Sequence, residues 1–425
     1  MTDPALNPSN LLSLAFAILL AASVLLKLWL ASRQMRHVAA HRHAVPAAFA
    51  RQITLEEHQK AASYTIAQGQ FGLLELAWGT AVLLGWTLLG GLSLLNGWIG
   101  NLVAPGLGQQ VALVVAFGAI GGVLDLPWAA WRTFVLEQRF GFNRTTVALW
   151  LQDLLKSTVV GALIGIPLVA LVLWLMGAAG TLWWLWTWGV WMGFNLLMLV
   201  VYPTWIAPLY NKFQPLEDAT LKERVTALMQ RCGFTSKGFY VMDGSRRSAH
   251  ANAYFTGFGS AKRVVFYDTL LAQLSPAEVD AVLAHELGHF KHKHITQRIV
   301  STFALSLAAL ALLGWLSQQV WFYTGLGVTP NLAGGNDALA LLLFMMALPV
   351  ATSFVSPLFA QISRKHEFEA DAFAAQNASG QDLANALLKL YKDNASTLTP
   401  DPVYVKFYYS HPPASERIAR MVAHG

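Results

Sequence analysis

Long apolar stretches constrain this chain more than any other feature of its sequence. An α-helix needs about 20 apolar residues to cross the hydrocarbon core of a bilayer, and windows of that length can be counted directly. We place such spans at residues 11–31, 71–94, 110–131, 158–177, 182–203, 299–320 and 337–359. With 55% hydrophobic and only 12% charged residues, the chain has too little polar surface for an ordinary soluble fold. The sequence therefore predicts a mostly α-helical, polytopic membrane protein with about seven transmembrane helices.

The basic residues indicate how these spans are oriented. All 29 Lys and Arg residues except Lys27 lie in residues 32–70, 132–157, 204–298 and 360–425. None lies in the alternate segments, residues 1–10, 95–109, 178–181 and 321–336. By the positive-inside rule the N-terminus faces out and the C-terminus faces the cytoplasm, which requires an odd number of spans. Because the net charge of +6 is spread over these segments, we expect no nucleic-acid partner.

A second feature is the run His285-Glu286-Leu-Gly-His289, in a stretch that predicts a helix. Two histidines four residues apart lie on the same helix face, which is the spacing that one divalent metal ion requires. Glu286 then lies beside the metal, where its carboxylate can take a proton from activated water. Ser275 and Glu278 match a capping box at the helix start. The pattern predicts hydrolysis; the alternative, two buried core histidines, is disfavoured by the glutamate between them.

A catalytic zinc ion normally has three protein ligands, so a third must be found. Cys232 is the only cysteine, which leaves His, Asp or Glu on the same side of the membrane. In a helix, Glu367 and Asp371 share one face, so one can bind metal while the other holds a ligand histidine by its free ring nitrogen. His366 and Glu369 point elsewhere. Taken alone, this segment could also be a solvated polar face.

The polar and apolar segments divide the chain into four parts. We expect an N-terminal membrane domain of five spans at 1–203, a first catalytic segment at 204–298, two further spans at 299–359 and a second catalytic segment at 360–425. The catalytic segments predict a small cytoplasmic α+β unit, with a helix and then strands at 219–232, 238–242, 248–255 and 263–270. In the first polar loop, the amphipathic residues 55–64 predict an interfacial helix.

Four motifs together resemble the CAAX prenyl protease 1 family, the polytopic zinc peptidases of the sterile-24 type. They are Asn252-Ala-Tyr-Phe-Thr-Gly-Phe, His285-Glu-Leu-Gly-His, Ser363-Arg-Lys-His-Glu-Phe-Glu-Ala-Asp and Ser410-His-Pro-Pro. The amino-terminal half resembles the family at Leu126-Pro-Trp, Phe134-Val-Leu-Glu and Pro208-Leu-Tyr-Asn, so the resemblance spans nearly the whole chain. It implies helices that enclose a chamber within the membrane, with the zinc site at the cytoplasmic end.

The resemblance also implies a ligand set for one zinc ion. His285, His289 and Glu367 match the family's zinc ligands. Because these three fill the set, we expect His292 and His294 not to bind the metal.

The remaining site residues are likewise implied by the resemblance. Glu286 would be the general base, and Asp371 would hold a ligand from behind. The pair Asn252-Ala253, on an edge strand, would bind the substrate backbone as a peptide adds to the sheet. His411 and Arg417 would steady the scissile carbonyl or the oxyanion. Spacing alone would make His411 an ordinary loop histidine.

The expected function is zinc metalloendopeptidase activity on peptide or protein substrates at the bilayer. The resemblance implies removal of the last three residues of prenylated CAAX proteins, although no feature of the sequence reports a prenylation pathway. An Ala-, Leu- and Trp-rich sequence without an ER-retrieval ending favours a bacterial inner membrane, and the ER membrane would be its equivalent in a eukaryote.

Two other functions stay open at this point. The first is a membrane-protein quality-control protease of the heat-shock type, although the multi-span amino-terminal region departs from those smaller proteins. The second belongs to a different class, a transporter or lipid-binding chamber with a structural zinc. Structural zinc favours four closed ligands rich in cysteine, which disfavours this alternative.

Overall fold

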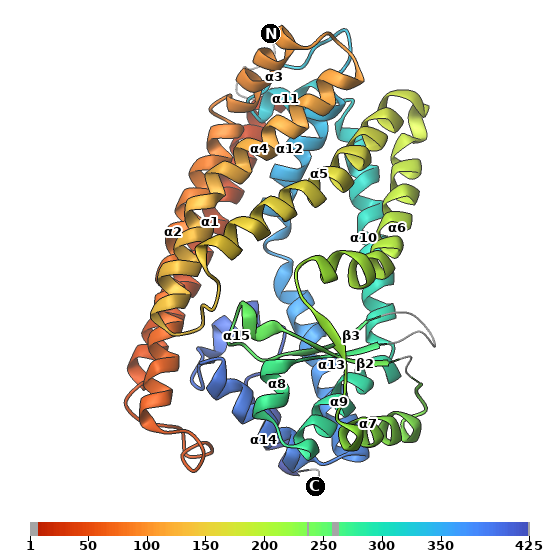
Figure 1. Cartoon of the computed structure of the whole chain (residues 1–425). Helices are drawn as coiled ribbons and strands as arrows, with labels where there is room; N and C mark the ends of the chain where they lie inside the picture. The colour runs from red at the N-terminus through yellow and green to blue at the C-terminus, as the bar shows by residue number, and fades with distance from the viewer. Residues whose placement is uncertain (1–6, 236–237, 257–262, 424–425) are drawn as a thin grey trace.

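The computed structural model describes residues 7–235, 238–256 and 263–423, and places a bundle of long helices above a smaller mixed unit (Figure 1). Among these residues, five helical segments are long and apolar enough to span a membrane: α1 (Pro8–His41), α4 (Leu107–Trp131) with its π-helical continuation to Glu137, α5 (Val147–Ala178), Gly180–Leu209 with α6 (Trp183–Val201), and α10 (His294–Leu316). Two bent pairs raise the number to seven, α2 (Leu55–Trp86) with α3 (Gly91–Leu102) and α12 (Asp337–Thr352) with α13 (Ser356–Asn377). The chain is a multi-pass membrane protein, as predicted.

Helix α2 corrects one expectation from the sequence. Residues 55–64 are not a separate interfacial helix, because Leu55–Trp86 forms one continuous helix that starts with a capping box at Thr54 and Glu57. No proline lies in residues 65–70, and an isolated glycine such as Gly69 weakens a helix without ending it. The amphipathic stretch is therefore the polar end of a membrane helix.

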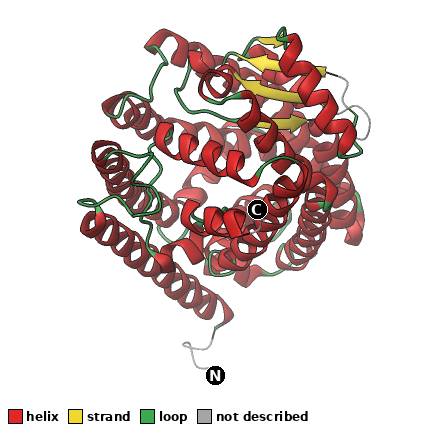
Figure 2. Ribbon diagram, turned by 90° about the horizontal axis from the view of Figure 1, so that it is seen from below, coloured by secondary structure: helices red, strands yellow, loops and turns green. Residues whose placement is uncertain are grey.

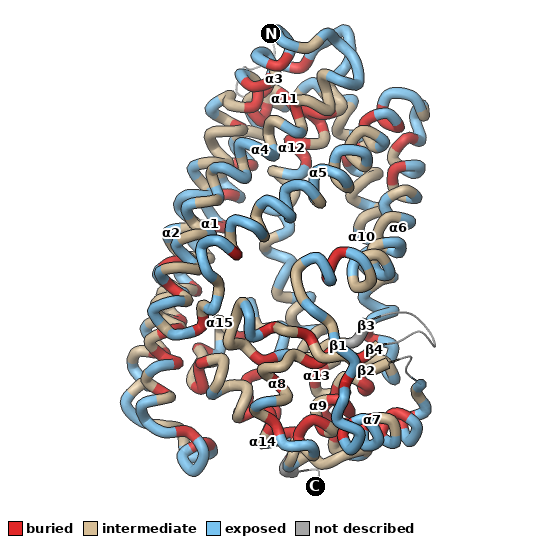
Figure 3. Tube along the Cα trace, in the orientation of Figure 1, coloured by how far each residue is buried: buried red, intermediate tan, exposed pale blue. Residues whose placement is uncertain are grey.

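Several membrane helices expose much of their surface, as α5 does along most of its length (Figure 3). Only 6% of the apolar window of α10 and 17% of that of α5 is buried within the chain. Large apolar side chains are exposed on the membrane helices, such as Leu163 on α5 and Trp186 on α6. Soluble proteins rarely expose so large an apolar surface, and lipid is the environment that suits it.

The smaller unit contains a four-stranded sheet with the order β1-β2-β4-β3. Its strands are β1 (Phe213–Pro215), β2 (Gly238–Met242), β3 (Ala253–Thr256) and β4 (Arg263–Tyr267). The central pair β2 and β4 is parallel, and the edge strand β3 runs antiparallel to β4. Seen from below, the strands lie together on one side of the unit and helices occupy the rest (Figure 2). The sequence did not predict β1, and the expected strand at 263–270 ends earlier, where α8 (Asp268–Gln273) begins.

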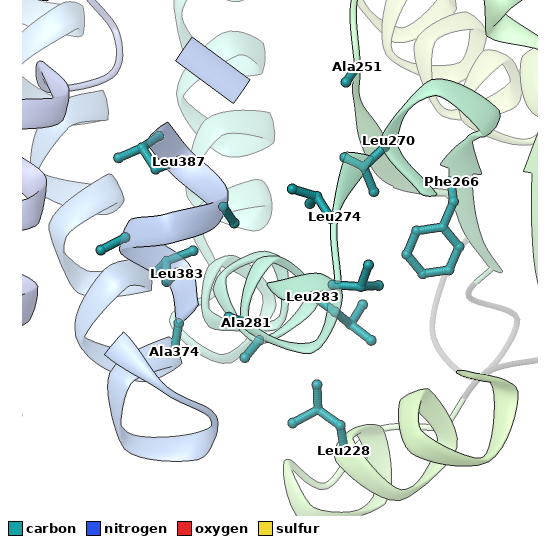
Figure 4. Close-up of a cluster of buried hydrophobic side chains, with 14 of the residues drawn as sticks. Leu228, Ala251, Phe266, Leu270, Leu274, Ala281, Leu283, Ala374, Leu383 and Leu387 are labelled. Carbon is teal, nitrogen blue, oxygen red and sulfur yellow. The ribbon is translucent and has the colours of Figure 1, made fainter. Parts of the chain in front are cut away.

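Helices from both polar segments cover this sheet and one another. They are α7 (Ala219–Arg231), α9 (Pro276–Lys291), α14 (Gly380–Asp393), α15 (Pro402–Tyr408) and α16 (Ala414–Ala423). Buried side chains from α7, β4, α9 and α14 meet in one cluster, among them Leu228, Phe266, Leu283 and Leu387 (Figure 4). Segments on either side of two membrane helices thus share one hydrophobic core.

Asp401, just before α15, links the second polar segment to α1. Its carboxylate accepts a hydrogen bond from Arg33 Nε at 2.9 Å, and its backbone N–H donates to Gln34 Oε1 at 2.7 Å. Burial alone would raise the pKa of Asp401, but hydrogen bonds from the Tyr404 N–H and Arg33 lower it below its ordinary value. The charged form of Asp401 is therefore favoured in the fold.

Candidate active site

The metal-binding pattern lies on α9, which packs against α13. Ser275 and Glu278 form the predicted capping box at its start, and Pro276 occupies its first turn. A regular helix from there carries His285 and His289 onto one face, toward α13. The start of the helix therefore fixes where both imidazoles lie.

Three side chains converge between the two helices. His285 Nε2 lies 3.5 Å from Glu367 Oε2, and His289 Nε2 lies 3.4 Å from Glu367 Oε1. One donor atom from each of the three lies within 4.8 Å of the others. Two imidazole nitrogens and a carboxylate at this separation can bind a single divalent cation.

The state of Glu367 tests whether these residues fit a metal ion. Its side chain is 5% exposed, and its Oε2 atom is buried without a hydrogen-bond partner among the described residues. A buried carboxylate oxygen without a partner is costly. A cation held between Glu367, His285 and His289 would satisfy this oxygen, so the site fits a metal.

Gly288 allows α9 and α13 to come this close. A Cβ atom at position 288 would lie 2.9 Å from the Cα atom of Ala370 and 3.1 Å from its carbonyl oxygen. Cβ contacts under 3.0 Å essentially never occur, so a residue with a side chain would push the helices apart. The glycine between the two histidines thus sets the distance between the imidazoles and Glu367.

Further ion pairs surround His285 and Glu367. His285 Nδ1 lies 2.9 Å from Asp371 Oδ1, and Arg417 donates to both Asp371 oxygens, at 2.6 and 2.9 Å. Arg417 Nη1 also lies 3.6 Å from Glu367 Oε2. Burial alone would lower the pKa of Arg417, but its ion pair with Asp371 raises it. Asp371 orients the His285 ring so that its other nitrogen faces Glu367.

His411 reaches the same cluster from the loop before α16. Its Nε2 atom lies 3.3 Å from Glu367 Oε1, and its side chain is 63% exposed. It lines a cavity of about 990 Å³ whose wall also includes Lys27 of α1, Glu75 of α2 and Tyr408 of α15. The cavity therefore lies between the membrane helices α1 and α2 and the loop that carries His411.

The expected substrate-binding residues lie at the edge of the sheet. Asn252 directly precedes β3 and is exposed, and its carbonyl accepts a hydrogen bond from the Tyr267 N–H at 3.1 Å. Its side-chain oxygen accepts from the Ala253 N–H at 2.8 Å. Within the described residues, β3 pairs only with β4, so its outer edge can accept an extended peptide.

Glu286 follows the first ligand histidine on α9 and is half-buried. Glu286 lies beside the cluster and is not part of it, because the three donor atoms come from His285, His289 and Glu367.

The contacts of His294 with His289 and Glu369 were not predicted from the sequence. His294 does not join the cluster of His285, but its Nδ1 lies 3.0 Å from His289 Nδ1 and its Nε2 lies 2.8 Å from Glu369 Oε2. In the sequence, only the dense run of histidines pointed to the contact between His294 and His289. The contact itself depends on a reversal of the chain at Lys293.

Comparison with known proteins agrees with this arrangement. Residues 34–212 match the CAAX prenyl protease N-terminal family, which has five membrane helices, and residues 215–424 match peptidase family M48. The CAAX prenyl protease 1 homolog of Arabidopsis thaliana is 36% identical over 301 residues, which are 70% of this chain and 69% of that protein. The Caenorhabditis elegans homolog is 32% identical and covers 97% of this chain and 98% of its own length. The chain belongs to the CAAX prenyl protease 1 family.

A solved structure extends the similarity to three dimensions. The crystal structure of S. mikatae Ste24p matches with a TM-score of 0.91 and 29% sequence identity, over 96% of this chain and 99% of that chain. As a member of the CAAX prenyl protease 1 family and of peptidase family M48, the protein is a membrane metalloendopeptidase that acts on peptide substrates. Neither a heat-shock-type protease nor a transporter with a structural zinc is favoured.

Proposed function

We propose that this protein is a zinc endopeptidase that removes the C-terminal tripeptide of prenylated, membrane-associated proteins. His285, His289 and Glu367 would hold one zinc ion. The observation that supports this most directly is the buried carboxylate of Glu367, whose Oε2 atom has no hydrogen-bond partner among the described residues and whose two oxygens each lie within 3.5 Å of one imidazole nitrogen. The prenylated substrate is proposed because the similar proteins are CAAX prenyl proteases.

The chemistry that zinc supplies in such a site is Lewis-acid polarisation of a carbonyl and activation of water at neutral pH. Glu286 would accept the proton of the attacking water on its carboxylate and pass it to the leaving amine. Asn252 and Ala253 would align the substrate backbone along β3.

Their contacts support different roles for His411 and Arg417. His411 is exposed to the cavity and lies at the cluster, so its imidazole is placed to donate to the oxyanion. Arg417 already donates to both oxygens of Asp371. We therefore assign Arg417 to holding Asp371 and Glu367 rather than to direct contact with the oxyanion.

Orientation and membrane are part of the proposal. The basic segments support an N-terminus outside and a C-terminus in the cytoplasm, which puts the metal cluster on the cytoplasmic side. The membrane would be a bacterial inner membrane, or the ER membrane in a eukaryotic cell.

The test uses the full-length protein in detergent and three substrates: a farnesylated CAAX peptide, the same peptide without the lipid, and a misfolded membrane protein. We expect chelator-sensitive cleavage with preference for the farnesylated peptide. Glu286→Gln should lower the rate by about 10²–10⁴-fold while zinc stays bound. Glu223→Gln, an exposed glutamate on α7, is the matched control. Full activity of Glu286→Gln with zinc bound would contradict the mechanism, and preference for the misfolded protein would contradict the substrate.

A further inference from the structure

A second group of metal-binding side chains lies beside the first. It consists of His294 at the start of α10 and of His366 and Glu369 on α13, with one donor atom from each within 4.8 Å of the others. His294 is 5% exposed. The rings of His294 and His366 are stacked, with centroids 4.0 Å apart and planes 9° apart. Two helices thus bring two imidazoles and a carboxylate to one place.

We propose that His294, His366 and Glu369 form a second zinc site and that a zinc ion bound there inhibits the peptidase. Imidazole and carboxylate are the donors that Zn²⁺ and its neighbours in the first transition row bind in proteins. His294 Nε2 and Glu369 Oε2 already lie 2.8 Å apart. An ion would replace the hydrogen bond between them and gain His366 as a third ligand. The His366 ring must then turn out of its parallel stack with His294, because imidazole binds a metal in the plane of its ring.

The second site is open to solvent from its own side. Glu369 has a side chain that is 36% exposed, and it lines a cavity of about 590 Å³ together with Lys365, Phe368 and Arg420. Among the described residues, the cavity wall also includes Asp371 but none of the histidines of either cluster. An ion can therefore reach Glu369 without passing through the catalytic cluster.

The chain reverses direction at Lys293, and this reversal brings His294 of the second site against His289 of the first. Lys293 adopts a left-handed conformation, with φ 58° and ψ 28°, between the end of α9 and the start of α10. This conformation is unfavourable for a residue with a side chain, and it turns His294 back toward His289. The result is the 3.0 Å contact between their Nδ1 atoms.

This contact makes the two ions compete. The argument rests on the proposed role of His289 as a catalytic ligand through Nε2, which leaves its proton on Nδ1. His294 Nδ1 then accepts that proton in a hydrogen bond, and its own N–H, at Nε2, donates to Glu369. An ion on His294 Nε2 moves the His294 proton to Nδ1, so two N–H groups face each other. Occupation of the second site therefore weakens the first.

The first test is a binding measurement that does not depend on activity. Metal-free, full-length protein in detergent is titrated with Zn²⁺, and bound ions are counted with a competing chelator dye. We expect two ions per chain, the second weaker than the first. His366→Ala should keep the first and lose the second. His292→Ala is the control, because His292 is an exposed neighbour that belongs to neither cluster.

The second test measures peptide cleavage as Zn²⁺ rises from one equivalent to excess. The wild-type rate should fall by about tenfold, whereas His366→Ala should keep its rate, and Glu369→Gln should reproduce that resistance. A single ion per chain, or inhibition that persists unchanged in both variants, would overturn the proposal. Because ion counting needs no substrate, failure of the proposed peptidase mechanism would be seen separately.

Discussion

Gly288 and Ala370 lie in direct backbone contact where α9 crosses α13, and a methyl group at position 288 would lie 2.9 Å from the Ala370 Cα atom. This contact places His285 and His289 against Glu367. The geometry of the proposed metal site is therefore set by a glycine, which has no side chain of its own.

Gly288→Ala tests that conclusion. The added methyl group should separate the helices and lower the stability by about 1–3 kcal/mol, despite the better helix propensity of alanine. We also expect weaker zinc binding, because the imidazoles move away from Glu367. Thermal unfolding in detergent and zinc content per chain measure both effects. Gly165→Ala in α5, where an added Cβ meets nothing within 4 Å, is the control. Unchanged zinc affinity in Gly288→Ala would show that the contact is incidental.

Asp371→Asn should be strongly destabilising. The amide keeps the shape of the carboxylate but removes the nearest counter-charge of the buried Arg417 guanidinium, whose other carboxylate, Glu367, is 3.6 Å away; breaking such a buried pair costs about 3–5 kcal/mol. Zinc affinity should also fall by about 10–100-fold as His285 loses its anionic partner. Asp280→Asn is a matched control, since Arg224 binds Asp280 in a more exposed ion pair and such pairs contribute about 0–1 kcal/mol. Equal effects of the two substitutions would argue against a special role for Asp371.

Metal removal should destabilise the wild-type protein. Zinc at 100 times its dissociation constant stabilises a folded protein by about 2.7 kcal/mol. Chelator should therefore lower the unfolding temperature, and added zinc should restore it. In Glu367→Gln the zinc-dependent shift should be much smaller, because only the proposed second site is left, whereas Glu286→Gln should retain the full shift. A full zinc shift in Glu367→Gln would remove this residue from the ligand set.

Asp401 should make stability depend on pH in the acid range. Because its pKa is lowered in the fold, its charged form adds stability above its unfolded value of about 3.9, and this contribution is lost as the pH falls through the folded value. The wild type should unfold at a higher temperature than Asp401→Asn at pH 6. The difference should begin to narrow near pH 4 and close only as the pH falls through the lower, folded value. Glu56→Gln, an exposed carboxylate on α2, should show no such difference. A gap that stays constant with pH would contradict the ion pair with Arg33.

Features that depend on local spacing could be predicted from the sequence. Apolar length predicted seven spans, and the capping residue Ser275 predicted where α9 begins. The interfacial helix was predicted wrongly, because periodicity alone does not show that residues 55–64 continue into a membrane helix. The i,i+4 rule put Glu367 and Asp371 on one face but left open which of them binds metal.

Contacts that depend on tertiary structure could not be predicted. Gly288 lies inside a regular helix and gives no signal in the sequence. It matters because Ala370, on another helix, packs closely against it. The contact of His294 with His289 requires a left-handed residue at Lys293, a position where glycine or asparagine would have been the recognisable signal. The pairing of His294 with Glu369 further requires α13 to lie against the start of α10.

The division of the proposed ligand set between α9 and α13 also has a consequence for biosynthesis. A nascent chain that has been synthesised only through α10 contains His285 and His289 but not Glu367, which follows α12. Until α12 and α13 have been synthesised and inserted, the proposed zinc site has only His285 and His289 as ligands, and it binds metal weakly. Cleavage would therefore begin only after membrane insertion is complete, which protects other newly made proteins near the translocation site from a half-made peptidase.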